Sequence, residues 1–373
     1  MIKEKVQARV LVLGAGKIGR LIGFLLADSK DYYVYLADLA EPDDRIKQIM
    51  QETTLVEMVS LNAKNSDKLK SFIKQYQVDI IVSSLPYYCN ASVIEIAKEL
   101  NLHYFDLTED TKTAAIAAEA ARSKNSSGKV FIPQCGLAPG FISIVANDLM
   151  KHFTELESVK LRVGALPTNI SNSLQYSITW SIDGLINEYG NLCQSIENYQ
   201  EVKVLPLEGM EEIKIDGLTY EAFNTSGGVG TLVESYLGKV KNLSYKTIRY
   251  PGHGQKMSFL MNDLQLNHDR ETLKRILENV LPRTFQDVVL VYVAVTGKQD
   301  GHFQEENYVK KLYPKKIKGM SWSAIQMTTA SGLCAVLDLV MANPGRYRGL
   351  VRQEDFLLED FIQNRFGQYY EQA

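Results

Sequence analysis

The chain has 373 residues, of which 45% are hydrophobic and 23% charged, with 20 Tyr, 13 Phe and 2 Trp. This composition supplies a sizeable core for two or three domains and excludes a disordered chain. Because 41 basic and 44 acidic residues leave a net charge of −3, we expect neither nucleic acid nor a membrane surface as a partner.

Cysteine and histidine spacing argues against a metal site. The four cysteines contain no CxxC pair and the five histidines no HxxxH pair, so we expect no bound metal. A chain of this length needs no disulfides, and reduced thiols predict a cytoplasmic protein. The apolar run Val10 to Leu13 is too short for a signal peptide. The stretch from Ala324 to Ala342 contains Gln326 and Asp338, which disfavours a membrane span.

The first third of the chain alternates strand and helix patterns. Short β-branched and aliphatic runs predict strands at residues 8–13, 33–37, 55–59, 79–83, 103–106 and 129–132. Helical spacing of apolar residues predicts helices at 17–27, 68–76, 91–100 and 111–121. Residues 123–128 are polar and predict a surface turn. This alternation predicts parallel βαβ units in an α/β, doubly wound sheet.

A different pattern follows Gly140. Strands are predicted at 159–165, 245–250 and 287–296, and helices at 141–151, 182–189, 269–280 and 323–341. Longer strands with embedded helices predict an antiparallel α+β domain. We expect a first domain at residues 1–140, an inserted α+β domain at 141–319, and helices at 320–373 that return to the first domain.

The motif Gly14-Ala-Gly16-Lys-Ile-Gly19 fits the GxGxxG fingerprint of dinucleotide-binding proteins. A strand precedes it, a helix follows it, and Asp38 ends the next strand, near the spacing that the fingerprint requires. Gly14 permits a tight turn, Gly16 permits close approach of a pyrophosphate, and Gly19 permits close packing of helix on strand. A glycine turn without a ligand is the alternative.

The residues around Asp38 indicate the kind of dinucleotide. A carboxylate accepts hydrogen bonds from both ribose hydroxyls but repels a 2′-phosphate, and no arginine adjoins Asp38, although Arg45 lies further along. We therefore expect NAD rather than NADP. The residues assigned to the cofactor are Gly14, Gly16, Lys17, Ile18, Gly19, Asp38, Ser83, Ser84 and Leu85.

Five segments in this order resemble the saccharopine dehydrogenase-like family. These are the glycine-rich start, residues 134–140, residues 164–167 with the following Tyr176 and Trp180, residues 221–228, and residues 246–253. The resemblance implies a Rossmann domain with an inserted domain that binds substrate and forms a homodimer. It also implies oxidation of a C–N bond in lysine or a lysine-derived amino acid, as in lysine 6-dehydrogenase or glutamate-forming saccharopine dehydrogenase, followed by hydrolysis of the imine.

Arg249 is our candidate for binding the substrate carboxylate, because a guanidinium forms a two-bond fork with a carboxylate. It lies in a predicted strand beside Tyr250, which we assign to the same site. A surface or interface ion pair is the alternative. Asn224 and Thr225 precede two glycines and are further candidates, against a simple capped turn. The resemblance implies an asparagine at position 224 in the saccharopine-binding members and a histidine in lysine 6-dehydrogenases.

Two candidates could handle protons. Asp106 ends the fifth predicted strand, where the resemblance implies an aspartate near the substrate amine; an N-cap of the next helix is the alternative, with Thr108 as a competitor. His253 lies in a Pro-Gly-His-Gly turn, and an imidazole that titrates near neutrality can shuttle a proton. A solvated loop histidine is its alternative.

Tyr176 and Trp180, four residues apart, can form an apolar wall for lysine methylenes or can belong to the core. Cys135 has no neighbouring cation in the sequence and is interpreted as a packing thiol. Two other functions remain open. One is a dehydrogenase for a carboxynorspermidine-type polyamine precursor, and the other is a non-catalytic NAD-binding sensor or scaffold.

Overall fold

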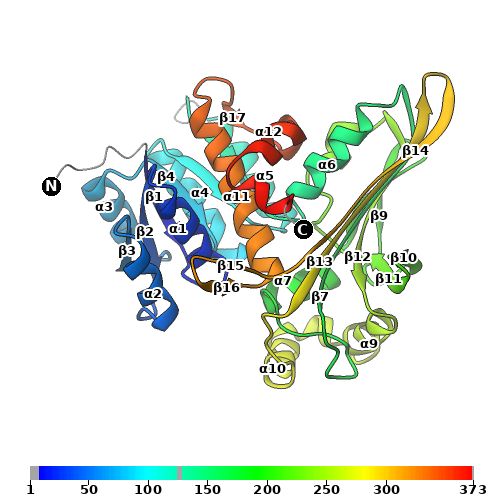
Figure 1. Cartoon of the computed structure of the whole chain (residues 1–373), viewed down its shortest axis with the longest axis horizontal. Coiled ribbons are helices and arrows are strands. Elements are labelled where there is room, and N and C mark those ends of the chain that lie inside the picture. Colours follow the sequence, from blue (N-terminus) through cyan, green and yellow to red (C-terminus); the bar gives the residue numbers. More distant parts are fainter. Residues whose placement is uncertain (1–7, 124–127, 372–373) are drawn as a thin grey trace. The chain divides into compact units, whose positions relative to one another are not determined.

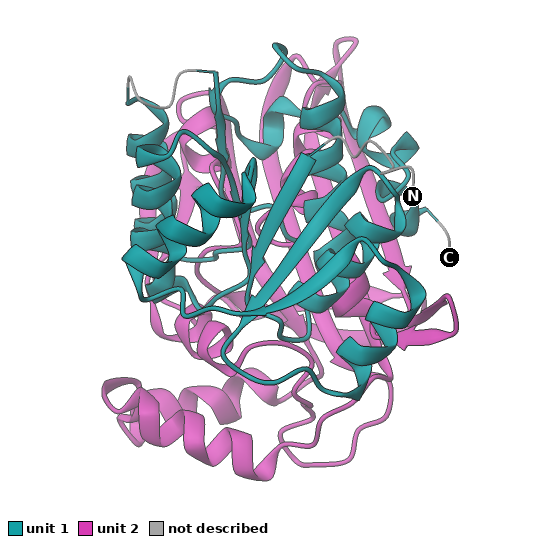
Figure 2. Ribbon diagram, turned by 90° about the vertical axis from the view of Figure 1, so that its left-hand side faces the viewer, with its two compact units in different colours: residues 1–136, 329–372 teal, residues 137–328, 373 magenta. Residues whose placement is uncertain are grey.

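The computed structural model describes residues 8–123 and 128–371, so residues 124–127 of the predicted turn lie outside the described part. The chain forms two compact units (Figure 2). Unit 1 contains residues 1–136 and 329–372, and unit 2 contains residues 137–328 and 373. The first domain was expected to end at residue 140, and the first segment of unit 1 ends at residue 136. The inserted domain was expected to end at residue 319, and the corresponding segment of unit 2 ends at residue 328.

Unit 1 is built on a seven-stranded parallel sheet with the order β17-β6-β5-β4-β1-β2-β3. Its strands are β1 (Ala8–Leu13), β2 (Tyr32–Asp38), β3 (Val56–Ser60), β4 (Ile80–Ser83), β5 (His103–Asp106), β6 (Val130–Ile132) and β17 (Gly349–Leu350). The predicted doubly wound α/β sheet is confirmed. The strand order reverses between β1 and β4, which is where such sheets bind ligands at the carboxyl ends of the strands.

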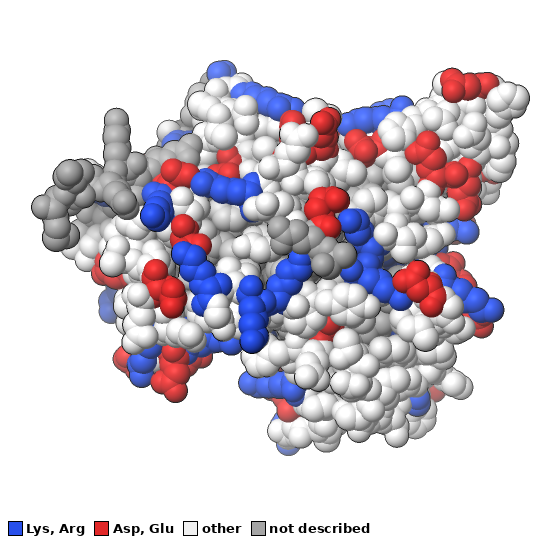
Figure 3. All heavy atoms as spheres, in the orientation of Figure 1, with Lys and Arg blue, Asp and Glu red and all other residues white. Residues whose placement is uncertain are grey.

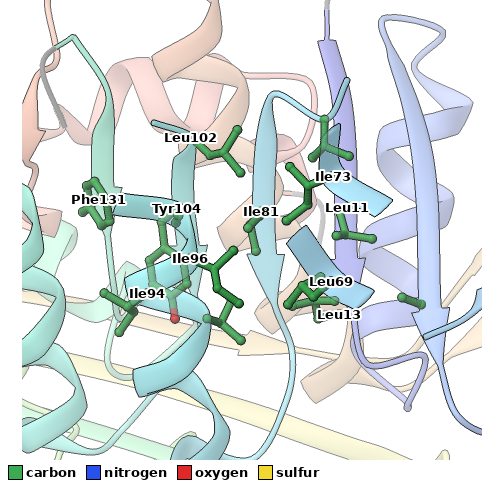
Figure 4. Close-up of a cluster of buried hydrophobic side chains, with 14 of the residues drawn as sticks. Leu11, Leu13, Leu69, Ile73, Ile81, Ile94, Ile96, Leu102, Tyr104 and Phe131 are labelled. Carbon is green, nitrogen blue, oxygen red and sulfur yellow. The ribbon is translucent and has the colours of Figure 1, made fainter. Parts of the chain in front are cut away.

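Helices cover both faces of this sheet (Figure 1). They are α1 (Gly19–Asp28), α2 (Asp44–Glu52), α3 (Ser66–Tyr76), α4 (Asn90–Glu99) and α5 (Thr111–Ala121). Figure 4 shows the core on one face, where Leu11, Ile81 and Tyr104 of the strands meet Leu69 and Ile94 of the helices. Helix α2 was not predicted, because Ile46 and Ile49 are its only buried residues and the rest of it is polar.

Helix α11 (Ala324–Ala342) begins in unit 2 and continues into unit 1. Among residues 8–123 and 128–371 it is the one helix with the length and hydropathy of a membrane span, and 83% of its apolar window is buried, as in a core helix. Within unit 1, Asp338 accepts hydrogen bonds from Tyr32 and from Arg365, which also pairs with Asp31. These contacts attach α11, and the segment that follows the short helix α12 (Leu358–Gln363), to the start of β2.

Unit 2 is built on an eight-stranded sheet with the order β10-β11-β12-β7-β13-β14, to which the hairpin β8–β9 is added beside β12. Its strands are β7 (Glu155–Pro167), β8 (Cys193–Glu197), β9 (Gln200–Val204), β10 (Glu211–Ile215), β11 (Leu218–Asn224), β12 (Val240–Arg249), β13 (Asp287–Gln299) and β14 (His302–Leu312). The central pair β12–β7 is parallel, and the other pairs of this sheet are antiparallel. The expected antiparallel arrangement is therefore confirmed except at this one pair, which makes the sheet mixed. A separate small hairpin joins β15 (Lys315–Ile317) to β16 (Met320–Trp322).

The helices of unit 2 are α6 (Phe141–Met150), α7 (Ile182–Gly190), α8 (Leu232–Tyr236), α9 (His253–Ser258) and α10 (Arg270–Val280). Helix α6 packs on β7, β13 and β14. Helices α7, α9 and α10 gather near one end of the sheet (Figure 1). Their shared core contains Tyr176, Tyr189, Phe223 and Met257, and it surrounds the polar cluster described below.

Candidate active site

The glycine-rich loop connects β1 to α1 in unit 1. Gly14 has φ +94°, and its N–H donates to the carbonyl of Ala37 at 2.8 Å. A Cβ on Gly19 would lie 1.8 Å from the Gly14 carbonyl oxygen. Both positions therefore require glycine, the first for its backbone conformation and the second for its close packing.

At Gly16, neither the backbone conformation nor the packing of the protein requires a glycine. It is exposed, and a Cβ added there would have no described atom within 4 Å. Lys17 and Ile18 follow it just before α1, and no side chain caps the start of that helix. The open backbone at Gly16 and the uncapped N–H groups fit a bound pyrophosphate.

Asp38 lies against this loop at the end of β2. One carboxylate oxygen accepts from the N–H of Ala15 at 2.8 Å, and the other accepts from Leu39 at 2.7 Å and Ala40 at 3.1 Å. The structure therefore brings the predicted ribose-binding acid next to the predicted pyrophosphate loop.

Two arginines lie near the same loop, Arg20 and Arg45, of which only Arg45 was expected there. Arg20 donates to the carbonyls of Ala15 and Gly16 and pairs with Asp43 at 2.8 Å. Burial, and then the positive charge of Arg20, lower the pKa of Arg45. The two guanidinium groups are therefore close enough to repel each other. Arg20 of α1 thus contacts the loop directly, and Arg45 of α2 lies close to Arg20.

The end of β4 completes this part of the site. The Ser83 hydroxyl bonds the Asn90 side chain at 2.7 Å and is buried, so it fixes α4 rather than facing a ligand. The Ser84 N–H donates to Leu13 at 2.8 Å. A Cβ added to Gly14 would meet both Ser84 and Leu85, so these two residues form one wall of the loop.

Asp106 is anchored inside unit 1. It is fully buried, and its carboxylate accepts from Tyr104 at 2.7 Å and from the N–H groups of Thr108 and Gln134 at 3.0 Å each. Burial raises its pKa. The geometry supports an anchoring role rather than the predicted contact with a substrate amine. The N-cap of α5 is Asp110, which corrects the alternative assignment as well.

Cys135 is fully buried beside this anchor, as interpreted from the sequence. Its thiol donates to the carbonyl of Ile132 at 3.0 Å, and burial raises its pKa well above the ordinary value. The thiol packs in the core and is not a nucleophile at neutral pH.

Arg249 of unit 2 is only 3% exposed. Its Nε donates to the phenol oxygen of Tyr189 at 2.8 Å, and Nη1 donates to the carbonyl of Ile248 at 2.8 Å. Its guanidinium carbon lies 5.2 Å from the ring centre of Tyr176 and 5.8 Å from that of Tyr189. Among the residues that the structure describes, none accepts a hydrogen bond from Nη2.

This cation keeps its charge in spite of its burial. Burial alone lowers the pKa of Arg249, but Tyr189, Tyr176 and Glu188 more than offset it and raise the pKa above its ordinary value. A buried guanidinium that has no carboxylate hydrogen-bonded to it is costly in an isolated protein, so an anionic partner would stabilise it.

His253, at the start of α9, is fully buried beside Tyr189. Its Nε2 lies 3.1 Å from the Tyr189 oxygen, and its Nδ1 lies 2.8 Å from the carbonyl of Leu174. Burial and then the charge of Arg249 lower its pKa from 6.5 to about 3. The expectation of an imidazole that titrates near neutrality is therefore wrong, because both nitrogens are bonded inside the core.

Glu221 fixes the turn that carries His253. It lies opposite Arg249 in the β11–β12 pair, and its carboxylate accepts from the N–H groups of Gly252 and Gly254 at 2.6 Å each. The carboxylate thus satisfies N–H groups at the start of α9 and holds His253 in place.

Tyr176 and Trp180 meet as predicted from their spacing, since the Trp180 ring N–H donates to the Tyr176 oxygen at 3.0 Å. The hydroxyl of Thr225 hydrogen-bonds the hydroxyl of Thr247 at 2.8 Å. Thr247 lies two residues before Arg249 on β12, so the two side chains are on the same face of that strand. The structure brings the aromatic pair together with Arg249 and His253, and it places Thr225 on the same side of the sheet.

Two other predicted substrate residues lie elsewhere, which corrects their assignment. Tyr250 directly follows Arg249, the last residue of β12, and faces the opposite side of the sheet. There its hydroxyl donates to the carbonyl of Pro167 at 2.8 Å and its ring stacks on Tyr220. Asn224 donates to the carbonyl of Leu205 at 3.2 Å, away from the cluster around Arg249.

Tyr189, Glu188 and Glu221 are members of this cluster that sequence reasoning missed. Tyr189 and Glu188 lie on a helix about 60 residues before Arg249, so no local pattern links them to it. Glu221 had a signal, because it opens one of the segments that resemble the family.

Charges elsewhere are mixed. Basic and acidic side chains are interspersed on the face shown in Figure 3. Within residues 8–123 and 128–371, no group of three or more His, Cys, Asp or Glu side chains is arranged to hold a metal ion.

A parallel sheet that ends in this glycine loop, with an acid on the adjoining strand, defines the class of dinucleotide-binding proteins. The chain belongs to the saccharopine dehydrogenase family. Residues 10–130 match the saccharopine dehydrogenase NADP binding domain, and residues 136–368 match the saccharopine dehydrogenase C-terminal domain. The resemblance predicted from the sequence is thereby confirmed.

Two curated proteins are similar to parts of this chain. Alpha-aminoadipic semialdehyde synthase of Arabidopsis thaliana is 27% identical over 215 residues, which are 50% of this chain and 20% of that protein. Carboxynorspermidine synthase of Vibrio alginolyticus is 20% identical over 171 residues, which are 40% of this chain and 41% of that protein. The chain therefore matches less than half the length of these curated relatives.

The structure of apo saccharopine dehydrogenase (L-Glu forming) from Saccharomyces cerevisiae has a TM-score of 0.73 to this chain. The two are 16% identical, and the match covers 93% of this chain and 94% of that one. The similarity shows that the two proteins share a fold over nearly their whole lengths.

Proposed function

We propose that the protein oxidises the C–N bond of lysine or a lysine-derived amino acid such as saccharopine, with NAD as the electron acceptor. Bound NAD would supply the hydride acceptor, and water would hydrolyse the imine that is left. The family and the names of the relatives support this substrate class.

The observation that carries the proposal is the buried guanidinium of Arg249. Its Nη2 is bonded by none of the described residues, and the rings of Tyr176 and Tyr189 flank it. An amino-acid carboxylate matches its charge and its planar donor geometry. The paired Tyr176 and Trp180 supply an apolar surface for lysine methylenes.

The preference for NAD rests on Asp38. Its carboxylate lies beside the open backbone of Gly16, the position expected for an acid that binds the ribose hydroxyls. Arg20 and Arg45 lie near the loop, and the matching family domain is described as NADP binding. Arg20 is paired with Asp43, however, so we propose that Asp38 decides the choice in favour of NAD.

The direct test is spectrophotometric reduction of NAD and NADP with L-lysine, L-saccharopine and carboxynorspermidine in turn. Turnover of lysine or saccharopine with NAD is expected. Equal kcat/KM with the two cofactors would contradict the NAD assignment, and Asp38→Ala with Leu39→Arg should raise NADP use. Dinucleotide binding without turnover of any substrate would favour the sensor.

The second candidate is a carboxynorspermidine-type dehydrogenase, which the similarity to carboxynorspermidine synthase favours. That substrate also carries one carboxylate for Arg249 but has no second amino-acid group. A kcat/KM for carboxynorspermidine above that for saccharopine and lysine would select it.

A further inference from the structure

Three hydrogen bonds in unit 2 join Arg249 to the backbone through two buried side chains. The Leu174 carbonyl can only accept, so Nδ1 of His253 carries the proton and donates to it at 2.8 Å. Nε2 is then the acceptor, and the Tyr189 hydroxyl donates to it at 3.1 Å. The Tyr189 oxygen accepts from Nε of Arg249 at 2.8 Å. The carbonyl of Leu174 therefore fixes which group donates and which accepts in each of the three hydrogen bonds.

We propose that Tyr189 is a positioning residue, held by His253, that orients the Arg249 guanidinium so that its Nη2 edge receives the substrate carboxylate. This inference rests on the proposed function. It assigns to Tyr189 and His253 a role in substrate affinity through Arg249 and not in the chemical step.

The geometry favours orientation over simple packing. Arginine is long and flexible, and the fork to a carboxylate needs its plane fixed. Nε and Nη1 are both committed, to Tyr189 and to the carbonyl of Ile248, which leaves the Nη2 side for a ligand. Tyr189 is 1% exposed and Phe223 lies edge-on to its ring, so the phenol itself has little freedom.

The neighbouring groups keep this chain in one protonation state at neutral pH. Burial raises the pKa of Tyr189, which keeps the phenol protonated, and burial with the Arg249 charge keeps His253 neutral. The phenol can therefore donate to the imidazole and accept from the guanidinium at the same time.

The test is Tyr189→Phe, which removes only the hydroxyl. We expect KM for L-lysine or L-saccharopine to rise about 10- to 100-fold, the size of one lost hydrogen bond to a charged group, with kcat and NAD affinity within about twofold of wild type. For 1,5-diaminopentane, which has no carboxylate, the ratio of the variant's KM to the wild-type KM should stay near one. Tyr236→Phe, which breaks a phenol bond to Asn147 in the same unit, is the matched control.

A second readout does not depend on turnover. In protein labelled with ¹⁵N-arginine, the Nε–H signal of Arg249 is identified by its loss in Arg249→Lys. Its hydrogen exchange should accelerate at least about tenfold in Tyr189→Phe and in His253→Leu, because the bond to the phenol protects it. In a double-mutant cycle, His253→Leu should add little to the effect of Tyr189→Phe on KM.

The outcomes separate the two proposals. If Arg249→Ala abolishes amino-acid binding while Tyr189→Phe changes neither KM nor Nε–H exchange, the positioning role is wrong and the proposed function stands. If Arg249→Ala leaves amino-acid turnover intact, the proposed carboxylate site itself is wrong. A fall in kcat alone after Tyr189→Phe would also overturn the positioning role.

Discussion

At the scale of single residues, Arg249 gives the most direct prediction. Removing one side of a buried charge pair costs on the order of 2–5 kcal/mol, so Arg249→Ala should lower kcat/KM for the amino acid by about 30-fold or more. Arg249→Lys keeps the charge but loses the planar fork, so it should also lower kcat/KM for the amino acid. NAD affinity, measured by fluorescence titration, should be unchanged. A loss of NAD binding instead would make Arg249 a structural residue.

His253 predicts how stability depends on pH. Its pKa in the folded state is about 3, below the ordinary 6.5. Between these two pH values, the imidazole is protonated in the unfolded chain and neutral in the folded chain. The free energy of unfolding should therefore be unaffected above about pH 6.5 and should fall by up to about 1.4 kcal/mol per pH unit below it. His103, with a pKa of about 4, adds a similar effect over most of the same window.

Urea unfolding between pH 7.5 and 5 measures this dependence. His253→Gln should reduce the slope of the curve below about pH 6.5, since glutamine does not titrate, and the contribution of His103 should remain. His302→Gln, at an exposed position on β14, is the matched control and should leave the curve as in wild type. An unchanged slope in His253→Gln would show that the imidazole is not kept neutral by the fold.

Residue-level prediction from the sequence succeeded where the chemistry is local. The glycine loop and Asp38 are recognisable because spacing alone places them together. Tyr250 could have been excluded from the site of Arg249, because consecutive strand residues face opposite sides of a sheet. Tyr189 could not have been found, since its contact with Arg249 depends on how α7 packs beside β12.

At the scale of elements, the glycine loop offers a matched pair of variants. Gly19→Ala places a methyl group 1.8 Å from the Gly14 carbonyl oxygen, so it should lower Tm and abolish NAD binding together. Gly16→Ala meets no described atom within 4 Å, so it should leave Tm unchanged yet weaken NAD binding. Differential scanning fluorimetry with and without NAD tests both. Unchanged NAD affinity in Gly16→Ala would move the pyrophosphate away from this loop.

The elements of unit 1 were predictable because each βαβ repeat carries its own pattern. The strand at His103–Asp106 and the helix at Thr111–Ala121 have the predicted bounds. In unit 2, the hairpin β8–β9 and the strands β10 and β11 were not predicted, since strands such as Gln200–Val204 are mostly polar and partly exposed. The parallel pairing of β12 with β7 joins segments about 80 residues apart, which no local pattern encodes.

At the scale of the whole molecule, the sheet of unit 2 bears on oligomeric state. In β14, Tyr308 packs against Phe141 of α6, so the adjoining Val309 faces the other side of the sheet, where it pairs with Tyr292. Val309 is 44% exposed, and Phe303 on the same side is 68% exposed. On this side Phe303 and Val309 alternate with the exposed polar residues Glu305 and Asn307. Because the family resemblance implies a homodimer and Phe303 and Val309 leave apolar area exposed, we propose that this side forms the dimer contact.

Light scattering after size exclusion tests this proposal. The wild-type protein should have twice the mass of the 42.0 kDa chain, and Val309→Glu should shift it toward the monomer, because two copies of a buried carboxylate would face each other across a twofold axis. Leu237→Glu alters a residue of similar exposure, 46%, just after α8, and should leave the dimer intact. A monomeric wild type would refute the dimer. A dimer that both variants leave unchanged would place the contact on another surface of the chain.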